Sequence, residues 1–122
     1  MPQKEERLRG PRYMVYWKAR SMLQDRTIFP TVIKTVSQGG FAIELDQAVS
    51  RGKDINLEFY VNYAGSDHRI RLKSTVIYCM ILSGNRGAYM EVKIKQISSE
   101  ERQIINNILD ALADSKEFDL RL

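Results

Sequence analysis

Apolar and polar residues alternate along most of this chain, and the alternation predicts β-strands. It is cleanest in "FAIEL" (residues 41–45), "INLEFYV" (55–61) and "AYMEVKIKQI" (88–97). A period of two places every second side chain on one face of a strand, so one face is expected to be buried. Three further stretches are rich in the aromatic and β-branched residues typical of strands: "YMVYWKARSML", "FPTVIKTV" and "HRIRLKSTVIYCMIL".

Short turn-forming stretches separate these runs. They are "DRT", "SQGG", "SRGKD", "YAGSD" and "SGNRG". Six or seven strands joined by such short turns predict a mainly β fold, a small antiparallel barrel or sandwich. A sheet that closes on itself leaves no exposed edge.

The periodicity changes after residue 97, where a helix is expected. The sequence S-S-E-E at residues 98–101 is a capping-box pattern, with Ser98 as the N-cap and Glu101 reaching back to it. Apolar residues then follow at helical spacing, at Ile104, Ile105, Ile108, Leu109 and Leu112. This predicts one amphipathic helix of roughly fourteen residues, or about four turns, that covers the open mouth or one face of the barrel.

Length and composition indicate a soluble single domain. The chain has 122 residues, of which 43% are hydrophobic and 28% charged. It shows no apolar run long enough to span a bilayer and no leader-like amino end, so we expect a cytoplasmic protein without membrane insertion. The single cysteine, Cys79, excludes an internal disulfide and a multi-cysteine metal cage.

The formal net charge of +4 is concentrated near the amino end. The first twenty residues hold an excess of basic over acidic side chains, and the rest of the chain is balanced: Lys4, Arg7, Arg9, Arg12, Lys18 and Arg20 stand against Glu5 and Glu6. We therefore expect a flexible basic arm at residues 1–11, a barrel domain with its closing helix at 12–113, and a loose charged tail at 114–122. A basic arm on a neutral body favours a local anionic partner over a broad nucleic-acid surface.

The residue types that enzymes need are scarce. His68 is the only histidine, so the usual zinc sites are excluded and any Ser-His-Asp triad would depend on it. Cys79 lies inside an apolar strand, where a buried and inert thiol is expected. No glycine-rich phosphate loop precedes a helix. We predict neither an enzyme nor a cofactor or metal.

Two stretches carry the candidate chemistry, "RLRGPR" (residues 7–12) and "TVSQGGFAIEL" (35–45). Taken alone, the Gly39-Gly40 pair predicts a hairpin corner with positive φ, and the arginines predict a solvated basic tail. Taken together, in this order and with a closing helix, they resemble the PilZ domain family over roughly residues 7–112. That family carries R-x-x-x-R before its first strand and [D/N]-x-S-x-x-G between two later strands, and it binds the bacterial second messenger cyclic di-GMP.

The motif positions match in part. Arg12 stands at the second arginine and Leu8 at the first, where Arg7 and Arg9 flank it. In the second motif Thr35 stands at the acidic or amide position. The resemblance implies a small split barrel and a cyclic di-GMP site formed by Arg7, Arg9, Arg12, Thr35, Ser37 and Gly40. Tyr78 is either a stacking platform or a core residue.

Arginine suits such a ligand because it can bind the O6/N7 edge of guanine, stack on the base and pair with phosphate. Aspartate or asparagine at position 35 would accept from a guanine N–H, whereas Thr35 offers only a hydroxyl. Losing one such contact costs about 1–3 kcal/mol.

Three functions stay open. The first is a cyclic di-GMP receptor or adaptor that orders its arm on the barrel and signals to an unidentified partner protein. The second is a PilZ-like interaction module in pilus or motility regulation that no longer binds the messenger, as Leu8 and Thr35 suggest. The third is a single-strand nucleic-acid binder that stacks bases on Trp17 and Tyr60, and the neutral body argues against it. The sequence leaves open whether the chain is a monomer or a dimer formed through its carboxyl-terminal helix.

Overall fold

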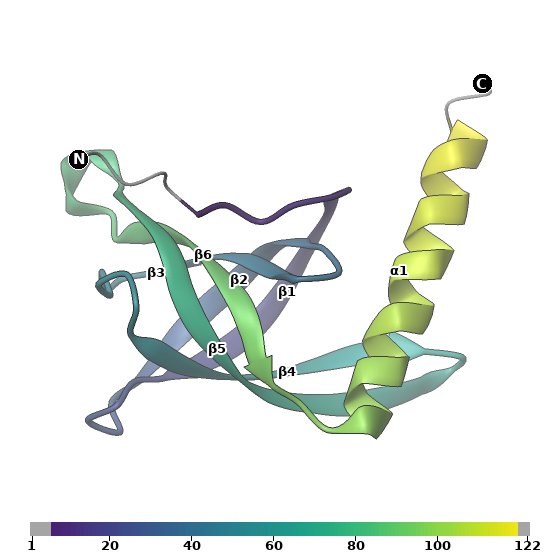
Figure 1. Ribbon diagram of the computed structural model, residues 1–122, viewed down its shortest axis with the longest axis horizontal. Coiled ribbons are helices and arrows are strands. Elements are labelled where there is room, and N and C mark those ends of the chain that lie inside the picture. Colours follow the sequence, from purple (N-terminus) through teal and green to yellow (C-terminus); the bar gives the residue numbers. More distant parts are fainter. Residues whose placement is uncertain (1–5, 120–122) are drawn as a thin grey trace.

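The computed structural model describes residues 6–119, in which six strands form a closed antiparallel barrel (Figure 1). The strands follow the order β1-β2-β3-β6-β5-β4 around the barrel, and β4 pairs with β1 to close it. Their bounds are β1 (Tyr13–Met22), β2 (Ile28–Val36), β3 (Gly40–Leu45), β4 (Asp54–Tyr63), β5 (Ser66–Ile81) and β6 (Ala88–Gln96). A short 3-10 helix, η1 (Ser83–Asn85), lies between β5 and β6. The predicted mainly β class is confirmed, and the barrel replaces the sandwich alternative.

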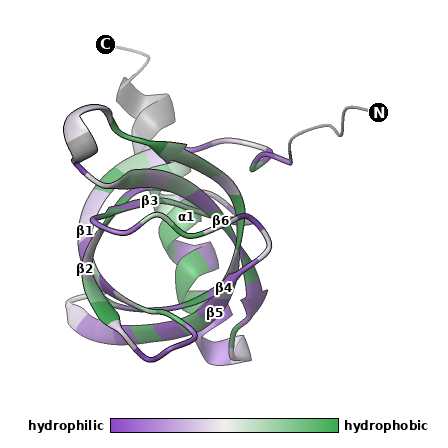
Figure 2. Cartoon of the chain, turned by 90° about the vertical axis from the view of Figure 1, so that its left-hand side faces the viewer, coloured by the Kyte–Doolittle hydropathy of each residue, from purple (hydrophilic) through white to green (hydrophobic). Residues whose placement is uncertain are grey.

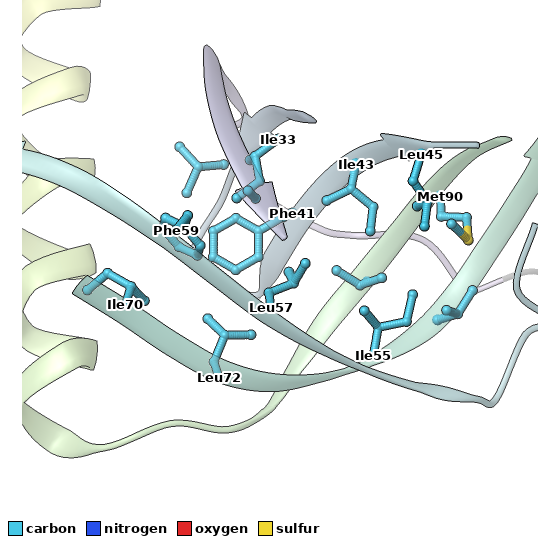
Figure 3. Packing of buried hydrophobic residues seen from close by; sticks show 14 of the residues in the cluster. Ile33, Phe41, Ile43, Leu45, Ile55, Leu57, Phe59, Ile70, Leu72 and Met90 are labelled. Carbon is cyan, nitrogen blue, oxygen red and sulfur yellow. The ribbon is translucent and has the colours of Figure 1, made fainter. Parts of the chain in front are cut away.

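The barrel interior is filled by the alternating apolar positions (Figure 3). In β4 all four alternating residues predicted to share one face are buried: Ile55, Leu57, Phe59 and Val61. The Phe41 ring meets that of Phe59 edge-on, with centroids 5.5 Å apart. Trp17 stacks on Phe59 at 5.6 Å. Trp17 therefore packs against the core, which removes one of the two aromatic platforms that the nucleic-acid hypothesis requires.

The helix α1 (Ser99–Asp119) closes one end of the barrel. Viewed along the barrel, α1 lies behind the ring of strands (Figure 2), and Ile105 and Ile108 belong to the buried core. Ser98 caps the helix as predicted, because the Glu101 amide donates to Ser98 Oγ at 3.2 Å. Glu101 does reach back to Ser98, where its carboxylate accepts from the hydroxyl at 2.7 Å.

The helix is longer than the roughly fourteen residues predicted. It has 21 residues and runs through most of the segment predicted to be a loose tail. The sequence after residue 112 contains no glycine or proline, so nothing in the backbone stops the helix there. Residues 1–5 and 120–122, which belong to the predicted arm and tail, lie outside the described residues. The domain boundaries proposed above remain predictions.

The residues considered for catalysis have ordinary surroundings. His68 Nε2 lies 3.3 Å from the carbonyl oxygen of Tyr63, across the turn between β4 and β5. Cys79 is only partly buried, contrary to the prediction, because a bulge between Val76 and Tyr78 interrupts the alternation of β5. None of the helices in the described part of the chain is both long enough and apolar enough to span a membrane.

Candidate functional site

A row of cross-strand partners crosses the outside of the barrel. Thr35 on β2 pairs with Ala42 on β3, Ala42 pairs with Glu91 on β6, and Glu91 pairs with Tyr78 on β5. Directly paired residues share a face of the sheet. The sequence neighbours of Ala42 and Glu91 belong to the interior core: Phe41, Ile43, Met90 and Val92. The row therefore points outward.

Two members of this outward row are nonetheless buried. Ala42 and Glu91 are both 0% exposed. The contacts of Glu91 identify one element that covers it, because Arg7, Leu8 and Arg12 donate hydrogen bonds to its carboxylate. From here on, the arm means the described residues that precede β1, residues 6–12. The first motif thus lies against the outer face of β6 and close to the position of the second motif on β2.

The Glu91 carboxylate accepts hydrogen bonds from two segments, residues 7–12 and β6. Arg7 donates from Nε to Oε1 at 2.9 Å and from Nη2 to Oε2 at 2.6 Å. Arg12 donates from Nη1 to Oε2 at 2.8 Å and from Nη2 to Oε1 at 3.1 Å. The Leu8 amide adds a bond to Oε1 at 3.2 Å, and the Tyr89 hydroxyl adds one to Oε2 at 3.0 Å. We call Arg7, Arg12 and Glu91 the arginine–glutamate cluster.

The electrostatics of the cluster follow from these bonds. Burial by itself would raise the pKa of the Glu91 carboxyl, but the hydrogen bonds from Arg7, Arg12, Leu8 and Tyr89 outweigh it and hold that pKa well below its ordinary range. The hydrogen bonds to Glu91 raise the pKa of both arginines. Burial, followed by the bond to Glu91, raises the pKa of Tyr89. Near neutral pH the cluster therefore holds two positive charges and one negative charge.

Tyr78 belongs to the same outer surface. The guanidinium carbon of Arg7 lies 3.9 Å from the centroid of its ring, which is a cation–π contact. The Tyr89 ring meets Tyr78 edge-on at 6.3 Å. The Tyr78 ring faces the arm and not the barrel interior, and its role as a stacking platform stays a prediction.

The second motif forms the turn between β2 and β3. Both the amide and the hydroxyl of Ser37 donate to the carbonyl of Gly40, at 2.9 and 3.0 Å. Neither Gly39 nor Gly40 has a positive φ, so that part of the prediction is wrong. Gly40 is needed for another reason: a Cβ there would lie 2.0 Å from the carbonyl oxygen of Val92 on β6. The glycine permits close approach of a strand, and Ser37 is committed to closing the turn.

Neighbouring elements fix this turn. The Gly39 carbonyl accepts from the Ile94 amide at 2.9 Å, and the Gln38 carbonyl accepts from Arg102 Nη1 of α1, also at 2.9 Å. Pro11, Gln38 and side chains of α1 line a hollow of about 470 Å³. The arm, the second motif and the closing helix therefore share one surface.

The structure brings together some of the predicted site residues and not others. Arg7, Arg12 and Tyr78 meet at Glu91, and Thr35 lies in the same cross-strand row. The Oγ1 atom of Thr35 is buried and has no hydrogen-bond partner. Arg9 is exposed, and no ion pair joins it to another residue of the described segment. Leu8, read from the sequence as a lost arginine, is instead a buried residue of the arm, 9% exposed.

Sequence reasoning missed Glu91 and Tyr89. The signal that was available is the alternation in "AYMEVKIKQI", which places both residues on the polar face of the last strand. That face also carries Lys93, which pairs with Glu6 at 3.2 Å. A basic arm needs a counter-charge, but the sequence does not tell Glu91 apart from other outward acids such as Glu44.

Comparison with known proteins identifies the family and the fold. A family model described as PilZ domain matches residues 4–111. No curated protein matches the chain. Among solved structures, the inhibitor of motility MotI/DgrA of Bacillus subtilis is 16% identical with a TM-score of 0.68, and the match covers 95% of this chain and 56% of that one. MrkH of K. pneumonia in its apo state is 17% identical with a TM-score of 0.71, covering 93% and 55%.

A third solved structure is an isolated domain of similar size. The PilZ domain of YcgR from Escherichia coli, solved with c-di-GMP, is 14% identical with a TM-score of 0.66, and the match covers 95% of this chain and 98% of that one. At these identities the likeness shows the fold. The chain spans about half the length of the first two proteins.

Proposed function

The chain belongs to the PilZ domain family, and from this membership we propose that it is a receptor for cyclic di-GMP that signals to a partner protein. PilZ domains are generally receptor or adaptor domains and not enzymes. The YcgR domain, which shares this fold, was solved with c-di-GMP. Both findings support the class of ligand, and the side chains of this chain support the place where it binds.

The arginine–glutamate cluster is the observation that carries the proposal. It gathers two guanidinium groups on the outer face of the barrel against a single carboxylate. The excess positive charge complements the phosphates of a cyclic dinucleotide. Guanidinium planes and the Tyr78 ring offer stacking surfaces for guanine. The side chains of Arg7 and Arg12 remain 45% and 29% exposed, so a ligand can reach them.

The second motif contributes less directly. The Ser37 hydroxyl closes its own turn, and Gly40 faces the backbone of β6. Both residues shape the floor beside the arm. Thr35 is the residue of this motif with an uncommitted polar atom, and its hydroxyl would hydrogen-bond the ligand in place of the family's carboxylate or amide. Most of the binding energy therefore falls to the arm.

A partner protein would detect nucleotide binding at the surface that the arm shares with α1. Moving the arm alters the hollow lined by Pro11, Gln38 and the helix. A partner protein that reads this surface would detect nucleotide binding. The motility inhibitor among the structural relatives suggests, by analogy of fold, a partner in motility control.

Isothermal titration with cyclic di-GMP tests the proposal, with GTP and a linear diguanylate as controls. We expect saturable heat for the cyclic dinucleotide at micromolar concentration and none for the two controls. Heat that is equal for all three nucleotides would reject a specific receptor. No heat at high concentration would reject nucleotide binding by the wild-type chain.

The second candidate is an interaction module that does not bind the messenger. The observation in its favour is that Glu91 already pairs with both arm arginines, while Leu8 and Thr35 depart from the motifs. Under this hypothesis wild-type protein gives no heat, and repair of both departed positions, with Thr35→Asp together with Leu8→Arg, creates binding. If the repaired protein still gives no heat with cyclic di-GMP, the chain has lost more of the binding site than these motif positions.

A further inference from the structure

The arm arginines present the same N–H groups to Glu91 that a nucleotide would need. Arg12 uses Nη1 and Nη2 on the carboxylate, and Arg7 uses Nε and Nη2. In both cases two N–H groups on one edge of the guanidinium bind the carboxylate. The same bidentate edge binds a phosphate or the O6/N7 edge of guanine. One edge cannot hold Glu91 and a ligand bidentately at the same time.

The arginines and Glu91 differ in what each loses when the arm moves away from β6. Arg7 and Arg12 are partly exposed and can be hydrated when they leave. The side chain of Glu91 is 0% exposed while the arm covers it, and it loses the donors of Arg7, Leu8 and Arg12 together when the arm leaves. The strength with which the arm is held is therefore set mainly by the carboxylate.

The backbone of the arm is held at the same point. The Leu8 amide donates to Glu91 Oε1 at 3.2 Å, and the Leu8 carbonyl accepts from Arg12 Nη2 at 3.1 Å. Arm position and arginine availability are thus controlled together by one side chain on β6.

We propose that Glu91 is an internal competitor of the nucleotide, a positioning residue that holds Arg7 and Arg12 on the barrel and raises the ligand concentration needed to take them. This inference rests on the proposed function and adds a regulatory residue that lies in neither family motif. Nucleotide binding exchanges the carboxylate for phosphate or guanine as the partner of the arginines. The carboxylate does not itself contact the ligand.

Glu91→Gln tests the proposal, because it keeps the shape and removes the charge. Glu58→Gln is the matched control: Glu58 lies on β4 and also pairs with two arginines, Arg20 and Arg69, at 3.5 and 2.8 Å. Glu91→Ala is a second variant that removes both oxygens. Thermal unfolding of each variant confirms that it is folded.

Two quantities are measured on the full chain. One is hydrogen exchange of the Leu8 amide without nucleotide, and the other is the Kd for cyclic di-GMP by titration. We expect Glu91→Gln to speed exchange and to tighten binding, each by about tenfold or more. Glu58→Gln should change neither. A purely structural role for Glu91 would weaken binding or leave it unchanged.

The outcomes separate this inference from the proposed function. Binding by wild type with no tightening in Glu91→Gln overturns the competition and leaves the receptor intact. Weaker binding in Glu91→Gln also overturns it, and would mean that Glu91 supports the site, either structurally or as a direct contact to the ligand. An absence of binding by wild type together with binding by Glu91→Gln supports the competition. An absence of binding by both wild type and Glu91→Gln rejects the receptor and the competition. Hydrogen exchange of the Leu8 amide then reports only whether Glu91 holds the arm.

Discussion

Arg12→Ala is expected to destabilise the protein more than an ordinary surface substitution, because it removes a partner from a buried charge. Arg12 donates two hydrogen bonds to Glu91, at 2.8 and 3.1 Å, and one to the Leu8 carbonyl at 3.1 Å. A hydrogen bond to a charged group contributes about 1.5–3 kcal/mol when it is well buried.

The lower end of that range applies here. The Arg12 side chain is 29% exposed, so water competes for its donors. Glu91 also keeps Arg7, Tyr89 and the Leu8 amide after the substitution. We therefore expect the free energy of unfolding to fall by about 2 kcal/mol. Arg20→Ala is the control, since Arg20 is 62% exposed and lies 3.5 Å from Glu58, and its loss should stay below about 0.5 kcal/mol.

Urea unfolding followed by tryptophan fluorescence is a suitable assay. Trp17 is the only tryptophan and stacks on Phe59 in the core, so its emission reports loss of the barrel. Glu91→Gln should cost less stability in the Arg12→Ala background than in wild type, because the pair between Arg12 and Glu91 is already absent there. Equal losses for Arg12→Ala and Arg20→Ala would refute this reasoning. So would a double variant whose loss is the sum of its two single losses.

Three further predictions follow from the same geometry. Gly40→Ala should lower the free energy of unfolding by at least about 2 kcal/mol, because its Cβ would meet the Val92 carbonyl at 2.0 Å. Gly39→Ala, with open space around it, should lower it by less than about 0.5 kcal/mol. Equal melting temperatures for the two variants would contradict this. Because the folded-state pKa of Glu91 lies below its ordinary value of 4.5, the unfolded chain takes up a proton first as the pH falls, so the stability due to Glu91 is full above pH 4.5 and is lost below it. Urea unfolding at neutral pH and at about pH 3.5 should show a larger acid loss in wild type than in Glu91→Gln, and equal losses would refute the shift. Thr35→Asp should tighten cyclic di-GMP binding about tenfold, measured by titration; an unchanged Kd would show that the missing acid does not limit affinity.

The barrel could be predicted from the sequence because its information is local. Strands such as β4 and β6 alternate strictly, and short turns join them. The helix cap at Ser98 likewise needs only four residues. The end of α1 was misplaced because charged residues without a glycine or proline extend a helix as readily as they form a tail.

The candidate site was only partly predictable because it depends on contacts between distant segments. Arg7 and Arg12 were chosen for their charge and their place before β1, and both do lie at the site. Glu91 was not chosen, since an acid on the polar face of a strand is ordinarily solvated, and its burial arises from contact with residues about eighty positions earlier. Gly40 was chosen from a motif, but the reason it is needed is the backbone of β6.

The most direct test of the account is an NMR titration of the wild-type chain with cyclic di-GMP that follows the Leu8 amide and the Nε–H signals of Arg7 and Arg12. The account predicts that these three signals shift together and saturate, because the nucleotide takes the arginines from Glu91 and moves the arm. Saturable shifts confined to another surface would contradict it, for instance at the hollow of about 860 Å³ lined by Arg20, Arg69 and Lys73. An absence of shifts at saturating nucleotide would contradict the receptor itself.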